Sequence, residues 1–478
     1  MSADTQDTRT GHVVVVGGGI SGLAAAHRLL GTGVRVTVLE GSGTLGGKLL
    51  TGEIEGVRTD FGAESMLARR TEGVGLARAV GLGDALQPPA IASASLWNRG
   101  ALVPMPKGHV MGVPGDAQAL TGVLSEDGLR RIAQDLELPR TEIGEDTALG
   151  EYVAARMGRE VVDRLVEPLL GGVYAGDVYR TSMRSSVPAL YEAVRSHDTL
   201  TGAVRSIQER TPNSSVAPAT PVFAGLEGGI GTLPGAVADA IRAGGGDIQL
   251  HRPVHELRRT GAGWRLRTDD GFVEADAVVL AAPAWAASAL LAAESPAASA
   301  ELAAVEYASM SLVTLAFRRS EVNLPKGSGF LVPPVDGHTI KASTFSSQKW
   351  AWADRDPELV LLRTSLGRYG DEAHLHREDA DLVDVSLSDL GEATGLSAKP
   401  VASAVTRWIG GLPQYPVGHL ARVGRIRTAV AALPGLSVCG AAYDGVGIPA
   451  CIAGAQRAAD EILATPTLVP GIPNGLGQ

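Results

Sequence analysis

The chain has 478 residues, of which 45% are hydrophobic, 4% are aromatic and 61 are glycine, and its formal net charge is −10. This length predicts at least two lobes. The negative charge excludes nucleic acid and an anionic membrane surface as general partners, and the two cysteines exclude a disulfide scaffold. The opening residues, MSADTQDTRTG, show no secretory signal, so we expect a flexible stretch over residues 1–11 and a cytoplasmic protein.

The first predicted elements are a strand and a helix joined by glycines. Residues 13–22 read VVVVGGGISG, which predicts a buried parallel strand over 13–16 followed by a helix. Gly17, Gly19 and Gly22 match the spacing of a dinucleotide-binding turn. Glycines let a ligand approach the backbone, and the helix start offers free N–H groups to a pyrophosphate. A purely structural glycine turn is the alternative.

The second predicted strand, residues 34–39, ends in Glu40. An acidic residue about 20 positions after such glycines is placed to bind the ribose hydroxyls of an adenosine. A surface glutamate is the alternative. The strand, turn, helix, strand and acid together favour dinucleotide binding.

Further along the chain the pattern changes and then returns. Residues 90–214 read as mainly helical, with helices around 149–166, and residues 211–220 read as a linker. Strands are expected at 247–250, around Val254, at 263–267, at 275–281 and at 436–440. The stretch 277–293 contains Pro283 and reads as a strand and a core helix, not as a membrane span.

We therefore predict a mixed α/β fold: a Rossmann-like nucleotide domain built from separated segments, a substrate-binding sheet domain and a helical insertion. The predicted boundaries are 12–89, 215–294 and 405–465 for the nucleotide domain, 90–214 for the insertion, 295–404 for the sheet domain and 466–478 for a flexible tail.

Several motifs resemble one enzyme superfamily. VVVVGGGISG with Glu40, LGGKLLT, and LSVCGAAYDGVGIPACIAGAQRAA resemble the flavin amine-oxidase/protoporphyrinogen-oxidase superfamily. GAES with Arg69 and Arg70, GLEGGIGTLP, PQYPVGH and GVGIP resemble its oxygen-dependent porphyrinogen oxidases, and most of all the soluble group common in Gram-positive bacteria. The resemblance spans nearly the whole chain. It implies oxidation of coproporphyrinogen III in haem biosynthesis, with FAD as cofactor and O2 as electron acceptor.

The resemblance also implies a set of FAD contacts. Lys48 stands where other members of the superfamily carry arginine, and a lysine offers a point charge instead of a bidentate fork. A loop glycine pair at 46–47, a core valine at 254 and a core tryptophan at 408 are the structural alternatives. The implied contacts are Gly17, Gly18, Gly19, Ile20, Ser21, Gly22, Glu40, Gly46, Gly47, Lys48, Gly62, Ala63, Glu64, Ser65, Val254, Trp408, Val446, Gly447 and Ile448.

No catalytic acid–base set or metal-ligand spacing is found in the sequence. His419 is expected to satisfy backbone groups, and Cys439 and Cys451 are expected to be small buried side chains, so the FAD should be bound without a covalent link. In a porphyrinogen the electron-rich pyrroles can assist hydride loss to a flavin, so the cofactor carries the chemistry.

A substrate with four propionates needs local cations in a chain of net charge −10. The candidates are Arg69, Arg70, Arg180, Arg184 and Lys341, and a solvated surface cation is the alternative for each.

Other functions stay open at this point. They are oxidation of protoporphyrinogen IX, an amine oxidase, a carotenoid-type desaturase, and a non-redox prenyl-lipid-binding escort protein of the same fold. The low aromatic content disfavours an amine cage, and the intact cofactor motifs disfavour the escort. A downstream ferrochelatase and a loose peripheral membrane contact are conceivable partners.

Overall fold

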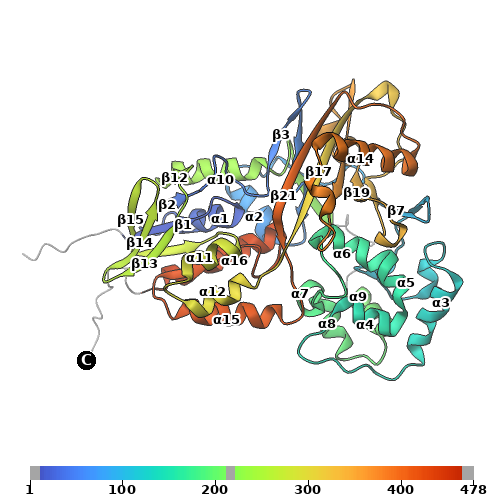
Figure 1. Cartoon of the computed structure of the whole chain (residues 1–478), viewed down its shortest axis with the longest axis horizontal. Coiled ribbons are helices and arrows are strands. Elements are labelled where there is room, and N and C mark those ends of the chain that lie inside the picture. The colour runs from blue at the N-terminus through green and yellow to red at the C-terminus, as the bar shows by residue number, and fades with distance from the viewer. Residues whose placement is uncertain (1–10, 211–220, 466–478) are drawn as a thin grey trace, which may run out of the picture.

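The computed structural model describes residues 11–210 and 221–465. The predicted tail at 466–478, the linker at 211–220 and nearly all of the predicted flexible N-terminus lie outside the described residues. Figure 1 shows three regions: a nucleotide lobe at the left, a large sheet at the upper right and a group of helices below that sheet.

The nucleotide lobe is built on a parallel sheet from three separated parts of the chain. Its strand order is β12-β2-β1-β16-β22, with parallel neighbours. The strands expected there from the sequence are confirmed. They are β1 (His12–Val16), β2 (Arg35–Leu39), β12 (Asp247–Gln249), β16 (Ala277–Leu280) and β22 (Leu436–Val438).

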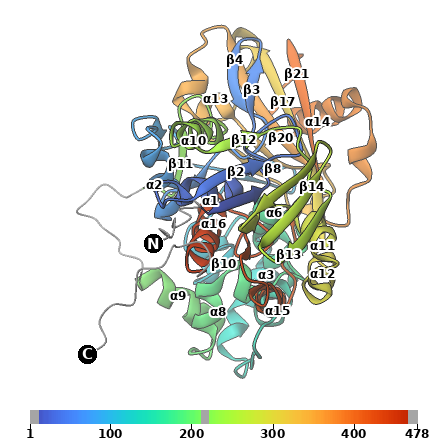
Figure 2. The same cartoon turned by 90° about the vertical axis from the view of Figure 1, so that its left-hand side faces the viewer.

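The apolar run at 13–16 is buried on both faces of this sheet. Val13 and Val15 face one hydrophobic core, and Val14 and Val16 face another. In Figure 2 the sheet lies between helices α1, α10 and α16 on one side and strands β13 and β14 with helix α11 on the other. The covering elements are α1 (Ile20–Leu29), α2 (Thr71–Ala79), α10 (Thr232–Ala243), α16 (Ile448–Leu463), β13 (Glu256–Thr260), β14 (Gly263–Thr268), β15 (Gly271–Ala275), α11 (Ala284–Leu291), α12 (Pro296–Ala303) and α15 (His419–Ala431).

The second lobe is a seven-stranded sheet of order β21-β17-β20-β19-β18-β7-β8. Helix α14 (Asp379–Thr394) packs on one of its faces. The strands are β7 (Ser95–Asn98), β8 (Ala101–Pro104), β17 (Tyr307–Arg318), β18 (Gly329–Leu331), β19 (Ile340–Thr344), β20 (Leu359–Leu366) and β21 (Ala402–Pro413).

The helical region has its own hydrophobic core. Its α6 contacts strands β18 and β19 of the seven-stranded sheet. The elements are α3 (Glu126–Ala133), α4 (Leu149–Met157), α5 (Arg159–Val161), a π-helical turn (Val162–Val166), α6 (Glu167–Tyr174), α7 (Met183–Ser186), α8 (Pro188–Val194) and α9 (Leu200–Arg210).

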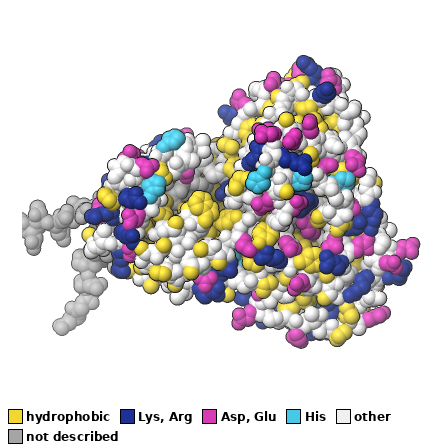
Figure 3. Space-filling view, viewed as in Figure 1, with side chains coloured by type: hydrophobic (Ala, Val, Ile, Leu, Met, Phe, Trp, Pro, Cys, Tyr) yellow, Lys and Arg dark blue, Asp and Glu magenta, His cyan; other side chains and the backbone are white. Residues whose placement is uncertain are grey.

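The remaining elements are short. They are β3 (Thr51–Ile54), β4 (Val57–Asp60), β5 (Met66–Leu67), β6 (Leu86–Gln87), β9 (His109–Val110), β10 (Val113–Pro114), β11 (Phe223–Leu226), α13 (Ser346–Lys349) and the 3-10 turns Ala117–Leu120, Gln134–Leu136, Arg319–Glu321, Pro334–Asp336, Ala351–Asp354 and Ala373–His376. On the face drawn in Figure 3, basic and acidic side chains lie interspersed.

Three details differ from the sequence prediction. Strands β7 and β8 fall in the range predicted as the helical insertion, yet they extend the seven-stranded sheet through β18. Strand β21 crosses the predicted boundary at 404/405 and pairs along β17, so its residues belong to that sheet. Val254 precedes β13 and lies in a loop. Each difference arises because strand pairing is a long-range choice that local sequence patterns do not record.

Candidate functional site

The glycine turn after β1 leaves space for a ligand. Gly17 has a φ of +110°, and a Cβ on Gly22 would overlap the carbonyl oxygen of Gly17, so β1 and α1 meet without side chains between them. A Cβ on Gly19 would meet no protein atom within 4 Å. Gly19 is also the N-cap of α1, and as a glycine it offers no side chain to the first N–H groups of this helix, which a ligand can therefore use.

Glu40 lies beside this turn. Its carboxylate accepts the N–H of Gly18 at 2.6 Å and the N–H of Ser42 at 2.8 Å. Val254 is half-buried in the neighbouring segment, where the N–H of Arg252 donates to the carbonyl oxygen of Glu40 at 2.8 Å. The Glu40 carboxylate has lone pairs left for ribose hydroxyls.

Residues 46–48 are hydrogen-bonded both to the glycine turn after β1 and to the loop at 62–65. The N–H of Gly46 donates to Gly18 at 2.9 Å, and Gly47 has a φ of +62°. The N–H of Ala63 donates to the carbonyl oxygen of Lys48 at 3.0 Å. The Lys48 side chain is exposed, but the protein around it removes water and lowers its pKa, against the opposite effects of Cys451 and Glu40.

A second long helix starts next to α1. Helix α16 begins at Ile448, and its N-cap Gly447 makes no side-chain hydrogen bond. Helix α1 packs against α16, and burial raises the pKa of Cys451 in the first turn of α16, against the smaller opposite effect of Ser21 in the first turn of α1. The N-termini of both helices therefore meet in one place, with Val446 and Ile448 beside them.

Trp408, on β21 of the seven-stranded sheet, contacts the loop that contains Gly62. Its indole N–H donates to the carbonyl oxygen of Phe61 at 3.1 Å, and its ring would lie 3.3 Å from a Cβ on Gly62. A Cβ on Gly62 would also overlap the carbonyl oxygen of Lys48. The 62–65 loop is thus held between the two lobes.

The side chain of Glu64 faces the sheet lobe. It forms ion pairs with Lys349 and, at 2.9 Å, with Arg363. The sequence reasoning missed both cations, because they stand some 300 residues from Glu64 in ordinary strand and helix contexts that carry no motif.

The structure does not bring the predicted substrate cations together. Arg69 and Arg70 are exposed at the start of α2, and Arg70 pairs with Glu72 at 2.7 Å. Arg184 lies over the ring of Tyr191 and donates to the carbonyl oxygen of Glu145 at 3.2 Å. Arg180 contacts Tyr369 and Glu306, and Lys341 lies near Glu167 of α6. The five candidate cations therefore stand in separate places, and which of them bind substrate stays a prediction.

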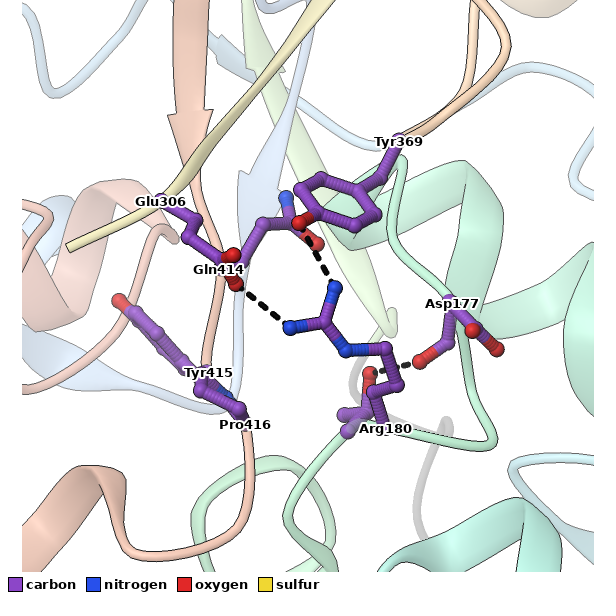
Figure 4. A pocket seen from close by; sticks show the side chains of 8 residues that line it. Asp177, Arg180, Glu306, Tyr369, Gln414, Tyr415 and Pro416 are labelled. Atoms are coloured by element: carbon purple, nitrogen blue, oxygen red, sulfur yellow. Dashed lines mark hydrogen bonds and ion pairs between the residues drawn. The ribbon is translucent and has the colours of Figure 1, made fainter. Parts of the chain in front are cut away.

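Arg180 lines a small hollow between the lobes. It donates to the hydroxyl of Tyr369 at 2.7 Å and pairs with Glu306 at 2.8 Å, as Figure 4 shows. Gln414, Tyr415 and Pro416 form the facing wall. The hydroxyl of Tyr415 donates to the carbonyl oxygen of Ala441, which links this hollow to the C-terminal motif. The Arg180 side chain is 47% exposed and remains accessible to an anion.

Lys341 is buried under α6. Its ammonium donates to the carbonyl oxygen of Gly367 at 2.8 Å, and burial, followed by the charge of Arg368, lowers its pKa to about 7. Its Nζ lies 3.9 Å from the sulfur of Met310. Met310 on β17 is the direct neighbour of Trp408 on the adjacent strand β21. Lys341 therefore lies on the same face of the sheet as Trp408.

A cavity of about 370 Å³ opens nearby, and its lining carries Asp163, Glu167, Asp177 and Asp371 together with Arg368. One carboxylate oxygen of Glu167 is buried without a hydrogen-bond partner. Burial raises the pKa of Glu167 to about 7, although Arg368 and Lys341 act in the opposite direction. So acidic a lining does not suit a tetracarboxylate.

We expect Glu167→Gln to stabilise the protein increasingly as the pH rises from about 4.5 to 7. A carboxyl whose pKa is raised by folding opposes the folded state once it ionises, and the neutral amide does not. The gain above pH 7 should reach at most about 3 kcal/mol. Urea denaturation of both proteins at pH 5 and pH 8 measures it. A difference that does not change with pH would contradict the assignment.

His419 is confirmed as a buried histidine that satisfies backbone. It hydrogen-bonds the carbonyl oxygen of Tyr443 at 3.1 Å, and burial lowers its pKa to about 4. Its ring is therefore neutral at pH 7 and is bound to the backbone at the start of α15. The described ranges 11–210 and 221–465 contain no group of three or more His, Cys, Asp or Glu side chains that could hold a metal ion. Over the same ranges, every helix is too short or too polar to cross a membrane.

Comparison with known proteins decides the family. The profile of the family described as flavin containing amine oxidoreductase matches residues 20–463. The chain belongs to this family. Coproporphyrinogen III oxidase from Mycobacterium tuberculosis (strain ATCC 25618 / H37Rv) is 36% identical over 94% of this chain and 96% of that protein. Coproporphyrinogen III oxidase from Bacillus subtilis (strain 168) is 33% identical over 95% of this chain and 98% of that protein.

A solved structure agrees with these sequence relatives. The crystal structure of a candidate protoporphyrinogen oxidase from Exiguobacterium sp. 255-15 matches with a TM-score of 0.84 and 32% identity, over 95% of this chain and 99% of that chain. The suspected family and the enzyme class are therefore confirmed: the chain is a flavin-dependent oxidoreductase.

The glycine turn and the two helix starts fit a flavin dinucleotide. The open space over Gly19 suits a pyrophosphate, Glu40 lies where a ribose would follow, and α16 begins beside α1 with a glycine as its N-cap. We propose that the residues assigned from the sequence hold the flavin, with Glu64 contributing its backbone, since its carboxylate is engaged by Lys349 and Arg363.

The flavin should be released when the protein is denatured. Cys439 and Cys451 are buried, and burial raises their pKa values to about 12 and about 11, so both remain thiols and not nucleophilic thiolates. Acid precipitation followed by absorption spectroscopy of the supernatant should recover the yellow chromophore. Flavin retained in the pellet would show a covalent link.

Proposed function

We propose that this protein oxidises coproporphyrinogen III to coproporphyrin III in haem biosynthesis. The supporting observation is its 33–36% identity, over 94–95% of its length, to coproporphyrinogen III oxidases from two bacteria. The resemblance found in the sequence points to the same substrate.

The reaction removes six electrons and six hydrogens from the macrocycle. A flavin held by the residues assigned above would supply the hydride acceptor and the route of electrons to O2. Three rounds balance the reaction: coproporphyrinogen III and three O2 would give coproporphyrin III and three H2O2. The pyrroles stabilise the cation left by hydride loss, which is consistent with a site that needs no dedicated base. The protein orients the macrocycle and excludes water.

We assign Arg180 to one propionate. Its guanidinium is half-exposed at the hollow between the lobes, and its bond to Glu306 can be exchanged for a charge-assisted bond to the substrate. Gln414 and Tyr415 place this hollow next to the C-terminal flavin motif. Arg69, Arg70, Arg184 and Lys341 have weaker geometric support.

The deciding experiment supplies coproporphyrinogen III and protoporphyrinogen IX separately and follows porphyrin fluorescence and peroxide. We expect at least tenfold higher kcat/KM for coproporphyrinogen, because a cation left without its propionate costs about 1–3 kcal/mol. Arg180→Ala should narrow this ratio. Arg184→Ala, a matched arginine that lies on Tyr191, should leave it unchanged. Equal ratios in both variants would remove Arg180 from the site.

Oxidation of protoporphyrinogen IX is the second candidate. It is favoured by 29% identity over 95% of this chain to protoporphyrinogen oxidase from Bos taurus and by the Exiguobacterium structure. A native preference for protoporphyrinogen in the same assay would establish it. In either case the product needs an enzyme that inserts iron into the macrocycle. We place a ferrochelatase downstream, in the cytoplasm, with at most peripheral contact to a membrane.

A further inference from the structure

The sheet lobe holds the backbone of the 60–64 loop. Arg363, on β20, donates to the carbonyl oxygens of Asp60 at 3.1 Å and Gly62 at 2.8 Å. The indole N–H of Trp408 donates to the carbonyl oxygen of Phe61, which lies between these two residues. Three successive carbonyl groups of the loop are thus bound by side chains that stand more than 300 residues away in the sequence.

The nucleotide lobe holds the other side of the same loop. The N–H of Ala63 donates to Lys48, and the N–H of Phe61 donates to Leu50 at 2.8 Å. The Asp60 carboxylate accepts the N–H groups of Ile230 and Gly231, each at 3.0 Å. The loop has little freedom, and Arg363 and Trp408 link it to the seven-stranded sheet.

Arg363, Glu64 and Lys349 form a buried charged triad. The side chains of Arg363 and Glu64 are 11% exposed and that of Lys349 is 17% exposed. Burial by itself would raise the pKa of Glu64, but Arg363 and then Lys349 outweigh it and lower that pKa. Glu64 is therefore ionised, and the three side chains of the triad together carry one positive unit in a poorly hydrated place. The Asp60 carboxylate also acts on Arg363, but burial raises the pKa of that carboxyl to about 6, and two backbone N–H groups bind its charge.

We propose that Arg363 is a positioning residue for the flavin: with Glu64 and Lys349 it fixes the 62–65 loop and supplies a net positive charge that favours the reduced, anionic form of the cofactor. This rests on the assignment of the 62–65 loop to the flavin and not on the identity of the porphyrinogen. Fixed charge near a group that becomes negative stabilises it most where water is excluded.

The test measures the midpoint potential, the visible circular dichroism and the dissociation constant of the flavin in the variant proteins, without any porphyrinogen. Arg363→Met leaves Glu64 and Lys349 with no net charge, and we expect the two-electron equilibrium to shift at least tenfold toward oxidised flavin, about 30 mV. The flavin should also bind at least tenfold more weakly, with an altered dichroism spectrum.

Two further variants separate charge from position. Arg363→Lys keeps the charge, so the potential should return close to that of the wild type. The dichroism should stay altered, because Arg363 binds both carbonyl groups through Nη1 and Glu64 through Nη2, and lysine has a single nitrogen for all three partners. Glu64→Gln adds a unit of net positive charge and should shift the potential in the direction opposite to Arg363→Met. A shift in the same direction would overturn the role of charge.

Arg164→Met is the matched control. Arg164 forms an ion pair of similar burial with Asp336 at 3.0 Å, between the helical region and the sheet. Its loss should lower stability without moving the flavin potential or spectrum. The proposal is overturned if Arg363→Met leaves potential, spectrum and affinity unchanged, or if Arg164→Met moves them as far. Neither result bears on which porphyrinogen the protein oxidises, because the substrate assay is a separate measurement.

Discussion

Replacing Gly22 with alanine is expected to destabilise the protein by about 3 kcal/mol and to abolish flavin binding at micromolar concentrations. A Cβ at this position would overlap the carbonyl oxygen of Gly17 and lie 3.2 Å from the Cβ of Ala281. Both obstacles belong to the strand–turn–helix junction, so α1 has to move away from β1 and β16. Urea denaturation of the apoprotein and a flavin titration measure the two effects.

Two other glycines act as controls. Gly75, in α2, has no protein atom within 4 Å of a Cβ, so Gly75→Ala should stabilise the helix by about 0.5–1 kcal/mol. Gly19→Ala also meets no protein atom, so the apoprotein should lose at most about 1 kcal/mol, which is the cost of alanine at the N-cap of α1. Its methyl group enters the space proposed for the pyrophosphate, so flavin affinity should fall. Wild-type affinity in Gly19→Ala would place the cofactor elsewhere.

The second large effect is expected for Arg156→Met, at about 3–5 kcal/mol of unfolding free energy. The Arg156 side chain is 1% exposed and the Asp135 side chain 0% exposed, and they pair at 2.6 Å inside the helical region. Arg156 also donates to the carbonyl oxygen of Pro139 at 2.6 Å. Methionine fills much of the space but leaves Asp135 as a buried charge without its cation. Equilibrium urea unfolding measures the loss.

An exposed arginine provides the comparison. Arg130 is 66% exposed and pairs with Asp127, so Arg130→Met should cost less than about 1 kcal/mol. Adding Asp135→Asn to Arg156→Met should recover part of the stability, because it removes the uncompensated charge. If Arg156→Met lost no more stability than Arg130→Met, the buried pair would contribute nothing beyond an exposed one.

The sequence by itself determined the nucleotide lobe and its ligand class. The valine run at 13–16, the glycines at 17, 19 and 22, and Glu40 lie within thirty residues, and their spacing reflects steric needs that act locally. Only a residue without a side chain fits at Gly22, and a run of valines buried on both faces requires a covered parallel strand. Such constraints remain in the sequence whatever the rest of the fold does.

Only the tertiary structure decided which distant groups meet. Arg363 and Lys349 reach Glu64 from the second lobe, while Arg69 and Arg70, which follow the flavin motif directly, point to solvent. The β7–β8 hairpin and strand β21 join one sheet from two parts of the chain about 300 residues apart. A charged side chain has the same local sequence signature whether it pairs across a lobe boundary or faces water, because its partner is chosen by long-range packing and the cost of burying charge.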